Sequence, residues 1–120
     1  MTPKTISLEP FTEGDAWSGI PQISITEGPE GGPFAPPASD LATVTMRFKK
    51  ADGTPDDVVE LSSAAAKITI TSANNWTFAI PPQVIAGLTT GRWNWNIRCI
   101  NAAGMPATYL TGQVNVLPTI

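Results

Sequence analysis

Proline and glycine interrupt this chain so often that they restrict which secondary structure it can form. Twelve Pro and ten Gly are spread over 120 residues. They leave uninterrupted segments of about five to ten residues, and such short segments suit strands better than helices. Within these segments apolar residues mostly recur at every second position, as in strands with one buried face. The sequence therefore predicts an all-β chain.

Eight segments have the strand pattern, and turn residues separate them. They are 5–8, 16–26, 41–50, 58–61, 67–71, 76–80, 92–100 and 107–117. The alternation is clearest in 41–50, where Val44, Met46 and Phe48 share one face. Seven or eight strands with turns every eight to twelve residues predict a single domain that folds as an antiparallel two-sheet sandwich.

The four Trp residues divide by their positions in this pattern. Trp76, Trp93 and Trp95 fall on the inward faces of predicted strands. Trp17 lies outside the strongly alternating segments, so it is the one of the four that we expect to be exposed. In 92–100 the residues between the inward ones are polar (Asn94, Asn96 and Arg98).

Three segments have a less regular pattern. Gly19 and Pro21 interrupt the second predicted strand and indicate a bulge or an edge position there. Residues 62–66 are rich in Ala but too short to nucleate a helix by themselves. Residues 82–88 fit a single helical turn, in which Val84, Ile85 and Leu88 would cover one end of the core.

Two segments outside the predicted sheets are candidates for contacts with other proteins. One is a flexible tail at about residues 1–9, and the other is the Pro/Gly-rich stretch 27–39, which cannot form a ladder of backbone hydrogen bonds. That stretch is either an exposed loop or an arm that docks on a neighbouring protein. The candidate contact residues are Phe34, Pro36, Pro37, Ile6, Leu8 and Trp17.

Charge and composition restrict the class of partner. The chain has 7 Lys+Arg, 10 Asp+Glu and a formal net charge of -3, so we expect neither nucleic acid nor an anionic membrane as a partner. We also find no signal peptide and no apolar stretch long enough to span a membrane, and we expect synthesis in a cytoplasm. Only 14% of the residues are charged, which suggests that part of the surface is covered in an assembly.

Residues that could carry catalysis or bind a metal are sparse. His is absent and Cys99 is the single cysteine, so the usual base for a nucleophile and an internal disulfide are both missing. The acidic turn from Asp52 to Asp57 is either a local turn structure or a calcium site. The N-terminal acids (Glu9, Glu13 and Asp15) do not define a catalytic pair. We therefore expect no cofactor, no metal and no enzymatic activity.

The order of elements from residue 14 to 118 resembles a known family. Its most specific parts are Leu-x-x-Gly-x-Trp-x-Trp at Leu88–Trp95 and Gly-x-Val-x-Val at Gly112–Val116. With the segments before them, they resemble the small immunoglobulin-like sandwich proteins of tailed bacteriophages and prophages. The layout is similar to the N-terminal domain of phage baseplate upper proteins, which attaches receptor-binding structures to the baseplate. The stretch 27–39 departs from the family, which has a short polar connection there.

This resemblance implies a non-enzymatic structural protein of the virion, assembled in the host bacterial cytoplasm. Attachment to the tail or baseplate is the leading expectation, and decoration of the capsid is the alternative. Its partners would be other virion structural proteins, and self-association is a further expectation. A carbohydrate-binding module that uses an exposed Trp17 is an alternative of another class, and an inhibitor or host-takeover factor is a third.

Overall fold

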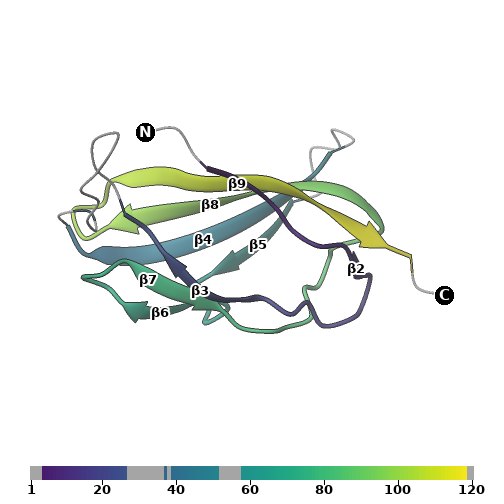
Figure 1. Ribbon diagram of the computed structural model, residues 1–120, viewed down its shortest axis with the longest axis horizontal. Helices are drawn as coiled ribbons and strands as arrows, with labels where there is room; N and C mark the ends of the chain where they lie inside the picture. The colour runs from purple at the N-terminus through teal and green to yellow at the C-terminus, as the bar shows by residue number, and fades with distance from the viewer. Residues whose placement is uncertain (1–3, 27–36, 38, 52–57, 119–120) are drawn as a thin grey trace.

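The structure, a computed structural model, describes residues 4–26, 37, 39–51 and 58–118. Within these ranges every regular element is a β-strand, so the all-β prediction is confirmed (Figure 1). The strands in chain order are β1 (Lys4–Ser7), β2 (Phe11–Thr12), β3 (Ile20–Ser24), β4 (Leu41–Lys50), β5 (Val58–Ser62), β6 (Thr69–Ser72), β7 (Thr77–Ile80), β8 (Gly91–Asn101) and β9 (Pro106–Leu117). Nine strands are one more than the largest number predicted, because the short β2 has no clear sequence pattern.

The strands form two sheets with the core between them. The large sheet has the order β1-β9-β8-β4-β5, and β2 also pairs with β9. The small sheet has the order β3-β7-β6 (Figure 1). A single cluster of buried apolar side chains includes residues from both sheets. The predicted two-layer packing of sheets around one core is therefore present.

The alternating apolar residues of the central strands fill this core. Val44, Met46 and Phe48 of β4 are fully buried, and so are Ile97 and Cys99 of β8. Burial of a large apolar side chain contributes roughly 1.5–3 kcal/mol to folding. The alternation therefore fixes which face of each central strand is buried and leaves the opposite face polar.

The N-terminal pairing differs from the antiparallel prediction. β1 runs parallel to β9, with Lys4 opposite Leu110 and Ser7 opposite Gln113. β2 is also parallel to β9, and its Phe11 lies opposite Val116. The segment expected to be a flexible tail thus contains β1, and its mobility in the isolated chain stays a prediction. Alternation within a strand does not encode the direction of its neighbour, so the sequence could not distinguish the two pairings.

The predicted helical turn at residues 82–88 is wrong. This segment has no helix, and Gln83 instead forms an isolated antiparallel bridge with Trp17. Ile85 and Leu88 are buried as expected, but Val84 is 58% exposed. The backbone groups of Gln83 bond across to another segment, so they cannot supply the local hydrogen bonds of a helical turn.

β3 has the irregularity that its Gly and Pro predict. Its register with β7 shifts between Ile20 and Ile23, and it lies at the edge of the small sheet. An edge position tolerates Pro21 because one side of the strand has no ladder partner. The prediction of a bulge or an edge is therefore confirmed in both respects.

Candidate functional site

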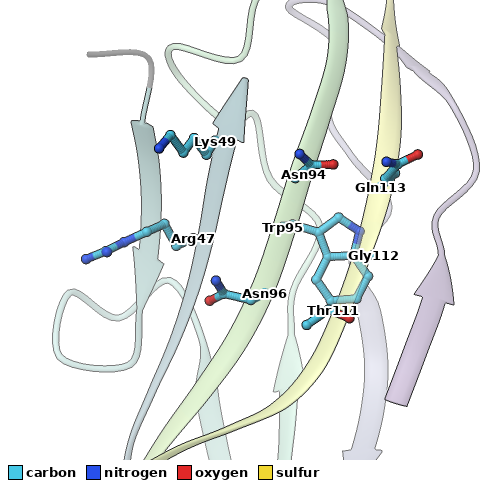
Figure 2. A pocket seen from close by; sticks show the side chains of 8 residues that line it. All are labelled: Arg47, Lys49, Asn94, Trp95, Asn96, Thr111, Gly112 and Gln113. Atoms are coloured by element: carbon cyan, nitrogen blue, oxygen red, sulfur yellow. The ribbon is translucent and has the colours of Figure 1, made fainter. Parts of the chain in front are cut away.

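The outer face of the large sheet carries an open polar hollow over β4, β8 and β9. Its volume is about 650 Å³. The residues that line it are Arg47, Lys49, Asn94, Trp95, Asn96, Thr111, Gly112 and Gln113 (Figure 2). Two polar side chains come from each of the three strands, so the hollow depends on the pairing of strands that are distant in sequence.

The strand register arranges these polar residues in two rows across the sheet. Directly opposite residues on neighbouring strands share a face, so their side chains are neighbours. One row is Arg47, Asn96 and Thr111, and the other is Lys49, Asn94 and Gln113. Each row therefore begins with a cation on β4, continues with an amide on β8 and ends with an uncharged polar group on β9.

Positive charge collects on this outer face although the protein is acidic. The alternation places Arg47 and Lys49 of β4 and Arg92 and Arg98 of β8 opposite to the buried residues of the same strands. These are four of the seven Lys and Arg residues of the chain. In the strands of the large sheet the one acidic residue is Glu60. The face is therefore basic, whereas the chain as a whole has a net charge of -3.

The two cations of the hollow differ in their partners. Arg47 donates from Nε and Nη2 to Oε2 of Glu60 on β5, at 3.1 and 2.9 Å. These side chains are 56% and 46% exposed, so solvent screens the pair and its contribution to stability is small. Lys49 has no ion pair with any residue in the described ranges. Its ammonium group is the cation available to a ligand.

Trp95 and Gly112 lie opposite each other on β8 and β9, at the register position between the two polar rows. Figure 2 shows the indole ring of Trp95 beside Gly112. Trp95 is 3% exposed, and its Nε1 has no hydrogen-bond partner among the described residues. The other buried β8 indole differs, because Nε1 of Trp93 donates to the carbonyl oxygen of Thr89 at 2.8 Å.

A second, smaller hollow lies beside the N-terminal segment that passes from the large sheet to the small one. Leu8, Phe11, Trp17 and Gly19 are among its lining residues. Phe11 and Trp17 stack with ring centroids 6.3 Å apart and an interplanar angle of 26°. The backbone of Trp17 also exchanges hydrogen bonds of 2.8 and 3.0 Å with Gln83. These contacts hold the crossing segment in place.

The expectation that Trp17 is exposed is wrong. Trp17 is 5% exposed and belongs to the buried core. Its burial results from the bridge to Gln83 and the stack on Phe11, which are contacts between segments that no local pattern predicts. An aromatic surface for stacking sugars cannot use this residue while the fold is intact.

Among the predicted contact residues that the structure describes, Leu8 and Trp17 lie together, since both line the second hollow. Phe34 and Pro36 lie outside the described residues, and Pro37 is half-buried. Ile6 occupies a position in β1 opposite Gly112. Leu8 is half-buried and packs against the core. The contact role of these residues stays a prediction.

The residues considered for chemistry have ordinary structural settings where they are described. Cys99 is completely buried, and this burial raises the pKa of its thiol from 9.0 to about 12. A thiol with that pKa is not a nucleophile near neutral pH. In the described ranges no three His, Cys, Asp or Glu residues are grouped to hold a metal ion, and the turn from Asp52 to Asp57 lies outside them. None of the described residues forms a helix that could cross a membrane.

The sequence analysis did not identify the hollow as a site, although the sequence does show that one face of β8 is polar. Asn94 and Asn96 alternate with Trp93, Trp95 and Ile97, which marks them as one polar face. The pairing that places them beside Arg47 and Gln113 is a property of the tertiary structure.

The comparisons with known proteins give no match to this chain. No protein-family model matches it, and neither does any curated protein or solved structure.

Proposed function

We propose that this chain is a non-enzymatic structural component of a tailed-phage virion that joins the tail or baseplate through protein contacts. The observation that carries the proposal is the strand order. The order β9-β8-β4-β5 in one sheet and β3-β7-β6 in the other corresponds to the G-F-C-C′ and B-E-D arrangement of immunoglobulin-like sandwiches. This correspondence supports the immunoglobulin-like class that the Leu88–Trp95 and Gly112–Val116 segments suggest.

The edge of the large sheet at β5 offers a specific mode of contact. An edge strand has unpaired backbone N–H and C=O groups on one side, to which a strand of another protein can add. β5 pairs with β4 over five consecutive residues without a register shift. Val58 at its start is 42% exposed. The small-sheet edges are less suitable, since β3 has a bulge and β6 has only four residues.

Quantitative mass spectrometry of purified particles tests the location. We expect the protein in the particles at the low copy number of a tail or baseplate component. Hundreds of copies per particle would instead assign it to decoration of the capsid. Its absence from particles would overturn both assignments.

Two matched substitutions test the contact at β5. A lysine on an edge strand opposes the addition of another strand, so Val58→Lys is expected to reduce incorporation into particles. Val84→Lys is the control, because Val84 is 58% exposed but lies outside the strands. If both variants assemble like the wild type, β5 is not the contact edge.

The stretch 27–39 is the second proposed contact element. We expect it to be cleaved by protease in the isolated chain and protected in the particle, as for an arm that becomes ordered on docking. A protease that spares this stretch in the isolated monomer would contradict its role as a docking arm.

A further inference from the structure

We propose that the polar hollow over β4, β8 and β9 binds a short acidic oligosaccharide, a role beyond the protein contacts proposed above. Its six polar lining side chains present cations, amides and a hydroxyl on one face of the large sheet.

The charge of the face selects an anionic ligand with few charges. Four cations and one acid are carried by the outer faces of β4, β8 and β5. Glu60 already accepts two hydrogen bonds from Arg47, so Lys49 is the cation that we expect to bind a ligand carboxylate. The net charge of -3 for the whole chain opposes a dense polyanion such as nucleic acid. An oligosaccharide with separated carboxylates can bind Lys49 through one carboxylate and has a lower charge density than nucleic acid.

The uncharged groups of the two rows suit a ligand rich in hydroxyl groups. An amide side chain both donates and accepts hydrogen bonds, and so does a hydroxyl group. Asn94 and Gln113 lie beside Lys49 in one row, and Asn96 and Thr111 lie beside Arg47 in the other. The rows cross three strands, a width of about 10 Å at the usual strand spacing. Sugar hydroxyls can therefore find donors and acceptors on β8 and β9 next to a carboxylate that binds Lys49.

The lining argues against an acidic protein segment as the occupant. The centres of protein interfaces are enriched in aromatic side chains and depleted of charge. In this hollow the one aromatic residue, Trp95, is only 3% exposed, and the other side chains that line it are polar. A partner protein would find no apolar anchor here, whereas a sugar does not need one for hydrogen bonding.

The test is a titration of the full chain followed by nuclear magnetic resonance. Tetragalacturonate is the acidic probe, maltotetraose is a neutral probe of the same length, and hexaglutamate represents an acidic peptide. We expect tetragalacturonate alone to shift the side-chain amide signals of Asn94, Asn96 and Gln113. The signal of Asn115, on the same face of β9 but outside the hollow, should move little. Raising NaCl from about 0.05 to about 0.5 M should weaken binding several-fold.

Two pairs of variants locate the binding. Lys49→Glu should weaken tetragalacturonate binding about tenfold or more, while Lys67→Glu, with the same change of net charge at an exposed residue outside the hollow, should change it less than about twofold. Gln113→Ala should weaken binding more than Asn115→Ala does. The amide spectrum of each variant shows whether the fold is retained.

Several results would overturn the proposal. If Lys49→Glu and Lys67→Glu weaken tetragalacturonate binding equally, the effect comes from the net charge of the protein and there is no specific site at Lys49. Equal binding of maltotetraose would remove the role of the cations, and equal binding of hexaglutamate would identify an acidic protein segment as the partner. An absence of shifts with tetragalacturonate at millimolar concentration would exclude this ligand class.

Discussion

Gly19 lies against Ile80 so closely that a Cβ atom at residue 19 would overlap the carbonyl oxygen of Ile80. The φ angle of Gly19 is +73°, which is the left-handed region that side chains other than glycine disfavour. This contact lies where the chain enters β3 and passes the end of β7. Glycine is therefore required at this position both by the backbone conformation and by the available space.

We expect Gly19→Ala to lower the free energy of unfolding by at least about 3 kcal/mol, because strain and overlap act together. Gly104→Ala is the matched control, since Gly104 has a φ of +83° but no atom within 4 Å of the added Cβ. Strain alone should cost about 1–2 kcal/mol there. Urea unfolding of both variants measures the difference, and equal losses would contradict the close approach to Ile80.

The four Trp residues should be protected from a quencher in solution. Their exposed fractions are 5%, 1%, 1% and 3% for Trp17, Trp76, Trp93 and Trp95. We expect acrylamide to quench the fluorescence of the folded chain weakly and that of the unfolded chain strongly. If part of the fluorescence of the folded chain is easily quenched, and that part is missing in Trp17→Phe, then Trp17 is exposed and its burial in the structure is contradicted.

Substitution of the two buried β8 indoles should have unequal costs. Trp93 loses its bond to the carbonyl oxygen of Thr89 when it is replaced by Phe, whereas Trp95 has no such bond to lose among the described residues. We expect Trp93→Phe to be more destabilising than Trp95→Phe by about 1–3 kcal/mol. Chemical unfolding of the two variants checks this order, and the reverse order would indicate that Nε1 of Trp95 has a partner.

Cys99 should make the stability depend on pH in alkaline solution. Its thiol has a pKa raised by burial from 9.0 to about 12 in the folded protein. Between these values the unfolded chain releases the proton and the folded protein retains it, so the free energy of unfolding falls as pH rises. The slope is about 1.4 kcal/mol per pH unit for one proton, and below pH 9 the effect is absent.

The control for this pH dependence is Cys99→Ala, which lacks the thiol but keeps every other titrating group. We expect the wild type to lose more stability than Cys99→Ala between pH 9 and 11, measured by urea unfolding at each pH. Parallel pH profiles of the two proteins would show that the thiol ionises equally in both states.

The ion pair between Arg47 and Glu60 should contribute little to stability. Both side chains are about half exposed, so a double-mutant cycle with Arg47→Ala and Glu60→Ala should give a coupling of at most about 1 kcal/mol. The coupling should decrease at high salt. A larger, salt-insensitive coupling would mean that the pair is shielded from solvent.

The local pattern predicted most strands, but it did not predict the site. β4, β8 and β9 occur within one residue of the predicted bounds, and their inward residues are the buried ones. Trp17 was misplaced because its burial depends on Phe11 and on Gln83, which is 66 positions away in the chain. The polar hollow was not recognised because its rows combine residues of three separate strands.

The sequence by itself determined that the chain forms short strands and which face of each central strand is apolar. Both properties depend on neighbouring residues only, namely on the breaks at Pro and Gly and on the period of two. Tertiary structure alone decided that β1 and β2 run parallel to β9 and that Lys49, Asn94 and Gln113 lie side by side. Strand partners, direction and register are contacts between distant segments, and an alternating pattern is compatible with several of them.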